Sequence, residues 1–118
     1  MILFFGSKSS DTHHFRNLVR GHFLKHNWTN IELDEYFTLM PSDRKLLGNK
    51  TGKNRLVFVV LLKFFQLEQC FPDRPYDIPQ TVINHVAHQL DITPAVYPEF
   101  QWGSRTHEHY RAQIRTCF

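Results

Sequence analysis

The sequence has few of the features that mark secreted or membrane proteins. Only 2 of its 118 residues are cysteine, Cys70 and Cys117, and their separation fits neither a C-x-x-C motif nor a disulfide framework. The longest unbroken apolar run, LVFVVLL at residues 56–62, is far shorter than the roughly 20 residues that cross a bilayer. The opening MILFF is too short for the core of a signal peptide. We therefore expect a cytoplasmic protein with reduced thiols and no membrane partner.

The sequence also lacks an arrangement of residues that indicates catalysis or a bound cofactor. It contains no Ser/His/Asp order and no distinctive pair of carboxylates. Its 8 histidines include two pairs at helical spacing, His22 with His26 and His85 with His88. Zinc needs three or four ligands, and no cysteine or acidic residue completes either pair. We interpret the histidines as surface or half-buried residues and expect no metal, no cofactor and no enzymatic activity.

The composition is that of one small globular domain. Hydrophobic residues make up 42% of the chain and aromatic residues 14%, which is enough for a core in a single unit of this length. The formal net charge of +3 is a mild excess that favours an anionic partner without requiring one.

Helical patterns occupy the first half of the chain. Residues 12–26 place apolar side chains on one face of a predicted helix. Thr29 and Glu32 have the spacing of a capping box, with Trp28 and Leu33 at the two hydrophobic-staple positions around it. The helix that starts there has an expected buried stripe of Leu33, Tyr36, Phe37 and Met40.

Two further helical segments follow before residue 70. Pro41 can open a turn that carries Leu46 and Leu47 inward until Gly48 stops it. The segment from Arg55 to about Gln69 contains no Gly or Pro, and its length favours a helix. Its polar residues gather on one side and predict a narrow solvated seam on an otherwise buried helix: Arg55, Lys63, Gln66 and Gln69.

The second half of the chain is divided by prolines. The segment FPDRPYDIPQ is expected to be a loop, and an amphipathic helix follows Pro79 with the apolar set Val82, Ile83, Val86, Ala87 and Leu90. Thr93 and Pro94 can start another turn, which Pro98 interrupts. Ser104 can cap a last helix whose Tyr110 and Ile114 face inward. The prediction is a compact, all-α single domain of about five to six helices.

The loop GNKTGKNR, residues 48–55, allows three interpretations. A nucleotide-binding P-loop needs four residues between its glycines and a hydroxyl after its lysine, and this loop has three residues and Asn54. A plain turn needs only glycines that adopt positive φ. Contact with nucleic-acid phosphates needs flexible cations beside a helix N-terminus, and Lys50, Lys53 and Arg55 supply them. The nucleotide interpretation fails, and the other two remain open.

A helix-turn-helix-like corner is predicted between residues 86 and 100. Such a corner needs a small residue where two helices cross and, four positions later, a residue that tolerates left-handed backbone geometry. Ala87 and Asp91 occupy these places, and apolar residues flank them: Val86, Leu90, Ile92 and Tyr97. The alternative is an ordinary helical corner, because Pro98 would shorten the second helix to little more than one turn.

Four blocks together resemble the N-terminal domain of Tn-three family transposases, the enzymes of replicative bacterial transposons. The blocks are YFTLMPSDRKLL, KTGKNRLVFVVLLKFFQLEQCFP, DIPQTVINHVAHQLDI and WGSRTHEHYRAQIR, and they agree in order and spacing. The resemblance covers residues 29–118 and leaves 1–28 as an N-terminal extension. The sequence departs from the family pattern at three places. Val57 and Asp91 stand where the family often has Gly, and EQCFP replaces a small residue followed by a basic one before Phe-Pro.

The resemblance implies a helical domain, often described as one of unknown function, that recognises the terminal inverted repeats of a transposon. Its partners would be double-stranded DNA and the remainder of the transposase, with a homodimer as a further possibility. The catalytic acidic triad belongs to a later domain, so we expect an excised domain, a truncated product or a remnant without enzymatic activity. The DNA-binding residues expected from the resemblance and the pattern are Lys50, Lys53, Asn54, Arg55, Thr93, Tyr97, Arg105, Arg111 and Arg115. The alternative is a packing or dimerisation module that does not itself bind DNA.

Overall fold

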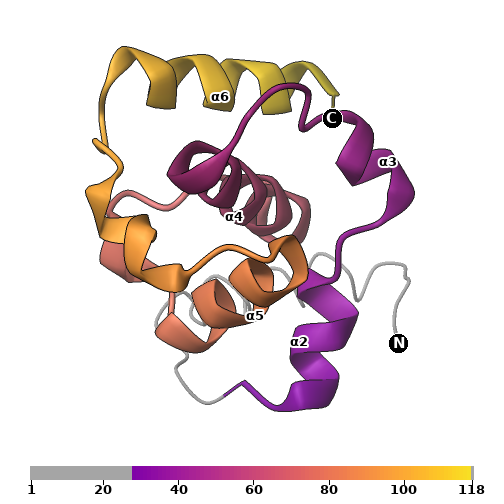
Figure 1. Cartoon of the computed structure of the whole chain (residues 1–118). Coiled ribbons are helices and arrows are strands. Elements are labelled where there is room, and N and C mark those ends of the chain that lie inside the picture. The colour runs from indigo at the N-terminus through magenta and orange to yellow at the C-terminus, as the bar shows by residue number, and fades with distance from the viewer. Residues whose placement is uncertain (1–27, 118) are drawn as a thin grey trace.

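A computed structural model describes residues 28–117 (Figure 1), and all regular structure in this part of the chain is helical. The elements are α2 (Asn30–Phe37), α3 (Pro41–Lys45), α4 (Gly52–Glu68), the 3-10 helix η2 (Pro75–Asp77), α5 (Gln80–Leu90), the 3-10 helix η3 (Pro94–Glu99) and α6 (Arg105–Cys117). The prediction of an all-α single domain is confirmed. The helix expected at residues 12–26 lies outside the described residues.

Helix α4 forms the centre of the molecule. Its side chains from Leu56 to Phe64 are all buried, because helices cover it on several sides. Helix α6 lies across one side of α4, and α5 lies on the opposite side with α2 next to it (Figure 1). Helix α2 packs against both α4 and α5. A helix that is apolar around most of its circumference can be stable only in such a position. The apolar run that was too short for a membrane is therefore the core of the domain.

The start of α2 is built as the sequence predicts. The Glu32 N–H donates to Thr29 Oγ1 at 3.1 Å, and the Thr29 N–H donates to Glu32 Oε1 at 2.9 Å, which completes a capping box. The expected stripe is only partly correct. Leu33 and Phe37 are buried, but Met40 is 55% exposed because α2 has already ended at Phe37.

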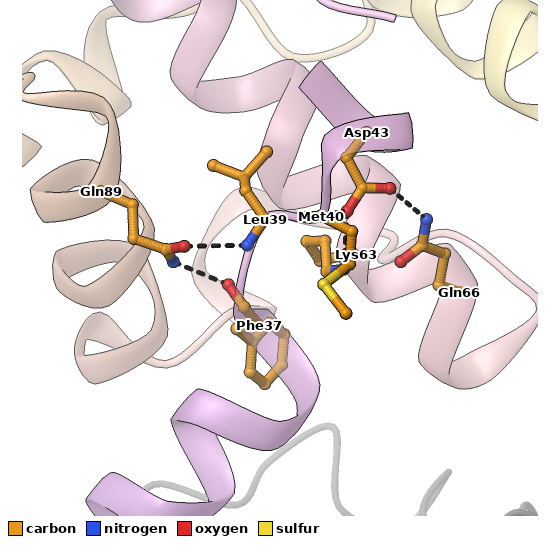
Figure 2. A network of polar contacts seen from close by, with 7 residues as sticks. All are labelled: Phe37, Leu39, Met40, Asp43, Lys63, Gln66 and Gln89. Atoms are coloured by element: carbon orange, nitrogen blue, oxygen red, sulfur yellow. Dashed lines mark hydrogen bonds and ion pairs between the residues drawn. The ribbon is translucent and has the colours of Figure 1, made fainter. Parts of the chain in front are cut away.

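The predicted solvated seam on α4 is wrong at Lys63. This side chain is only 7% exposed, and its ammonium lies 3.0 Å from the carboxylate of Asp43 on α3. The other Asp43 oxygen accepts a hydrogen bond from Gln66 at 2.9 Å (Figure 2). Helix α3 covers this part of α4 and supplies a buried counter-ion. A sequence cannot show which polar stripe a neighbouring helix will cover.

Gln89 on α5 holds the link between α2 and α3 (Figure 2). Its amide donates to the Phe37 carbonyl at 2.8 Å, and its carbonyl accepts from the Leu39 N–H at the same distance. These two backbone groups would otherwise be left without partners where α2 ends. One side chain of α5 therefore fixes the chain direction between two other helices.

Candidate nucleic-acid interface

The loop between α3 and α4 is a turn made possible by two glycines. Gly48 has φ +54° and Gly52 has φ +56°, values that other residues rarely adopt. The prediction of positive φ at these glycines is confirmed. Thr51 precedes α4, and its side chain makes no cap hydrogen bond to the first turn of that helix.

Lys50 is not a free cation of this loop. Its ammonium donates to Gln113 Oε1 on α6 at 3.2 Å and lies 4.3 Å from the ring centre of Phe58 and 5.2 Å from that of Tyr110. The amide of Gln113 in turn donates to the Leu46 carbonyl at 3.4 Å. Burial lowers the pKa of Lys50 from its ordinary value. Lys50 therefore ties the loop to α6 and is poorly placed for the predicted contact with a phosphate.

Lys53 is the cation of the loop that remains available. Its side chain is exposed and has no hydrogen bond or ion pair with the described part of the chain. Asn54 and Arg55 are half-buried, and the Nε of Arg55 is buried without a partner among residues 28–117. Lys53 thus fits the predicted role best, and Arg55 and Asn54 reach solvent only in part.

The predicted corner has the expected backbone geometry. Asp91 adopts φ 58° and ψ 44°, the left-handed conformation that its position requires. The Ile92 N–H bonds the Ala87 carbonyl at 3.0 Å, and the Asp91 N–H bonds the His88 carbonyl at 3.2 Å. This pair of bonds is a Schellman motif and ends α5. Ala87 is fully buried where the chain turns.

The element after the corner is unlike a recognition helix. It is the six-residue 3-10 helix η3, capped by Thr93, whose Oγ1 accepts from the Ala95 N–H at 3.4 Å. Tyr97 is 7% exposed, and its hydroxyl donates to the Pro75 carbonyl at 2.9 Å. Burial, with a smaller effect of Asp77, raises the pKa of Tyr97 well above its ordinary value. Tyr97 is a core residue here, and its predicted contact with DNA does not fit this placement, whereas Thr93 is exposed.

A shallow hollow of about 390 Å³ lies beside this corner. It is open to solvent and lined by side chains of both elements: Asn84, Ala87, His88, Asp91, Ile92, Thr93 and Pro94. Two histidine or acidic side chains are too few for a metal site, and no group of three or more His, Cys, Asp or Glu side chains between residues 28 and 117 could hold an ion.

Helix α6 carries the other predicted cations. Ser104 Oγ accepts from the His107 N–H at 3.2 Å, which confirms the predicted cap. Tyr110 and Ile114 are buried as expected, and Tyr110 meets Phe58 edge-on with ring centres 5.4 Å apart. Arg105 and Arg115 are exposed, and Arg111 is half-buried.

Arg111 and Arg115 gather around one aromatic side chain, Phe71. Their guanidinium carbons lie 5.8 Å and 5.5 Å from its ring centre, and the Phe65 ring stacks on Phe71 at 4.7 Å. Arg111 also pairs with Glu108 at 2.8 Å. The structure thus brings two predicted residues together on one flank of α6, while Lys50 lies against the opposite flank.

His107 is a buried histidine that the sequence did not single out. Its Nδ1 accepts a hydrogen bond from the Gly103 N–H at 2.9 Å, so the neutral ring carries its proton on Nε2. Nε2 is buried without a partner among the described residues. Burial lowers the pKa of His107, and the positive charge of Arg111 lowers it further against the opposing effect of Glu108.

Sequence reasoning also missed the Lys63–Asp43 pair and the Gln89 clamp. A signal for the first was present, because a single lysine inside VVLLKFF must either reach solvent or meet a buried acid. Nothing in the sequence around Gln89 indicates that its side chain binds backbone groups of Phe37 and Leu39. No helix in residues 28–117 is both long enough and apolar enough to cross a bilayer.

Comparison with protein families places the chain among domains without an assigned function. It belongs to the family described as "Domain of unknown function (DUF4158)", whose model matches residues 22–118. All the described helices fall within this match. No curated protein and no solved structure matches the chain.

Proposed function

We propose that this chain is a domain that binds double-stranded DNA and serves a Tn-three family transposase by recognising the terminal inverted repeats of its transposon. The transposase assignment rests on the four sequence blocks that resemble that family. The DNA-binding assignment rests mainly on one structural observation, the arrangement of cations around α6, of which Arg105, Arg115 and Lys53 are exposed. Three arginines and a single glutamate lie on this helix, and the loop that bears Lys53 runs beside it (Figure 1).

The geometry around Lys53 suits a phosphate. Lys53 is the second residue of α4, whose N-terminus has no side-chain cap. Backbone N–H groups and the helix dipole favour an anion at such a place, and a flexible lysine adds a full positive charge. Contacts of this kind position a protein on DNA without reading its sequence.

The test is the salt dependence of binding to a labelled random-sequence duplex. Lys53→Gln together with Arg115→Gln removes two exposed cations. If each contacts one phosphate, the slope of log affinity against log salt should become less steep by about 2.

The matched control is Gln80→Glu with Asn84→Asp. Both residues are exposed on α5, on the other side of α4 from α6, and the change lowers the net charge by the same amount. This control should leave the slope almost unchanged. Equal losses in the two variants would show that only net charge matters and would remove the assignment of the interface.

A packing or dimerisation module is the second candidate. Among residues 28–117, three large apolar side chains are exposed, Ile31 at 77%, Met40 at 55% and Tyr76 at 69%. Ile31 and Met40 lie close together in sequence around α2. A concentration-dependent dimer in sedimentation, with no shift of any duplex at low salt, would favour this candidate over DNA binding.

A further inference from the structure

The corner after α5 is a poor reader of base edges. A recognition helix must project several side chains into a groove, but η3 has six residues, contains Pro98 and buries Tyr97. Val96 is packed against the core as well. Thr93, Ala95, Pro98 and Glu99 are the exposed residues that remain, and Glu99 would repel phosphates.

Helix α6 has the geometry that η3 lacks. It spans 13 residues, and its buried side chains, His107, Tyr110 and Ile114, lie along a single stripe. On the opposite side runs a stripe at spacing i, i+4, i+7, i+11 that is exposed throughout: Arg105, His109, Ala112 and Thr116. At 3.6 residues per turn these four positions fall within roughly 60° of the helix circumference. We call this set the outer stripe.

Both flanks of α6 are held by contacts with the rest of the domain. On one flank Arg111 and Arg115 lie over Phe71. On the other flank Gln113 binds Lys50 and the Leu46 carbonyl. Contacts on both flanks therefore fix the helix that carries the outer stripe. Rigid elements position base contacts better than loops do.

We propose that α6 is the helix that enters the major groove, with its outer stripe against the base edges and with Arg111, Arg115 and Lys53 beside the phosphates. This inference rests on the proposed DNA binding and names the element that performs the recognition. An α-helix with side chains is about 10–12 Å wide, close to the roughly 12 Å width of the major groove.

The residue types of the outer stripe are suited to base edges. Arginine bonds guanine through its O6 and N7 atoms, threonine can bond several bases, and the alanine methyl can contact the methyl group of thymine. His109 presents both a donor and an acceptor in its neutral form. With three arginines and one glutamate, α6 is complementary in charge to the DNA backbone.

Glu108 allows a test in which the proposal predicts that a substitution raises the affinity for DNA. It lies on the same flank as Arg111 and neutralises it at 2.8 Å. Glu108→Gln would remove the ion pair of Arg111 while leaving its contact with Phe71, and it would remove a negative charge beside the phosphates. Affinity for a random duplex should rise by roughly two- to fivefold at low salt, and the gain should shrink as salt increases. An unchanged or lower affinity would contradict the placement of this flank.

The decisive experiment compares base preferences selected by the full 118-residue chain from a pool of random duplexes. One variant changes the outer stripe, with His109→Gln and Ala112→Ser. Its matched control changes the corner, with Thr93→Ser and Ala95→Ser. All four positions are exposed and all four changes are neutral in charge, so folding should be preserved, which circular dichroism checks.

We expect the outer-stripe variant to enrich a different consensus from the wild type and the corner control to enrich the same one. A changed consensus in the corner control alone would overturn this inference and leave DNA binding intact. If the wild-type chain binds duplexes but enriches no consensus, this inference is also overturned and DNA binding is left intact. A wild-type chain that binds no duplex at low salt would overturn the proposed function itself, and this inference with it.

Discussion

At the scale of single residues, Lys63 and Asp43 form a buried ion pair in the core. Burial by itself would raise the pKa of Asp43, but hydrogen bonds from Met40, Gln66 and Lys63, together with the charge of Lys63, lower it below its ordinary value of 3.8. The Met40 N–H donates to the same oxygen that binds Lys63, at 2.8 Å. Every strong partner of this carboxylate is therefore within the protein, and water is largely excluded.

Removing one member of this pair should be costly. Lys63→Met leaves a buried carboxylate without its counter-ion, and we expect the free energy of unfolding to fall by about 3–5 kcal/mol. Lys53→Met, the same change at an exposed position of the same helix, should stay within about 0.5 kcal/mol. Urea unfolding of both variants measures the difference. Because the carboxylate is protonated at low pH, the gap between Lys63→Met and wild type should narrow as pH falls through the lowered pKa of Asp43.

His107 should make stability depend on pH near neutrality. The folded state lowers its pKa below 6.5, so the unfolded chain binds a proton more readily in the range between 6.5 and the lowered value. The contribution of His107 to stability is thus fully present above 6.5 and is lost as pH falls through this range.

His107→Asn offers a side-chain acceptor for the Gly103 N–H but cannot titrate. Denaturant unfolding at a series of pH values should show a shallower loss of stability on acidification for this variant than for the wild type. Parallel pH profiles for the two proteins would rule out His107 as the cause.

At the scale of elements, three helix starts were the most predictable features, whereas α2 ends earlier and α4 begins earlier than the sequence predicted. The capping box at Thr29, the start at Pro41 and the cap at Ser104 all depend on residues close in sequence, and each is found as expected. The apolar set of α5 is also buried as predicted, because an amphipathic helix with one apolar face has only one way to dock. The 3-10 form of η3 was not predicted, although Pro98 gave warning of it.

The Schellman end of α5 leads to a prediction at Asp91. This residue pays a steric penalty for its left-handed backbone, which aspartate tolerates better than most residues. Asp91→Ala should lower the free energy of unfolding by about 1–2 kcal/mol. Asp91→Gly should leave stability nearly unchanged or raise it slightly, since glycine adopts this conformation freely. Thermal unfolding of the two variants in parallel tests whether the backbone, and not the carboxylate, limits this position.

At the scale of the whole molecule, the basic residues divide into those that hold the fold together and those that remain available. Lys50 joins the α3–α4 loop to α6 and lies over two aromatic rings. Lys53, three positions later, is exposed and has no hydrogen bond or ion pair with residues 28–117. The two lysines look alike in sequence. Their roles separate only when the helix from the end of the chain lies beside the loop.

This division predicts opposite outcomes for two similar changes. Lys50→Ala should lower the free energy of unfolding by about 1–3 kcal/mol, because the Gln113 amide and two rings lose a partner. Lys53→Ala should leave stability unchanged and weaken binding to a random duplex at low salt. Unfolding curves and duplex titrations on both proteins make the comparison. A large stability loss in Lys53→Ala would place that side chain in the structural group instead.

The sequence by itself determined the helical class, the starts of α2, α3 and α6, the left-handed position of Asp91 and the inward faces of α5 and α6. These features follow from capping residues, glycine, proline and the period of apolar side chains, all of which act over a few neighbouring residues. Only the tertiary structure decided the burial and the partners of Lys50, Lys63 and Tyr97. Each of them meets a partner 20 or more positions away. Such pairings depend on how helices pack, because burial turns an exposed charge or hydroxyl into one that must find a partner inside the protein.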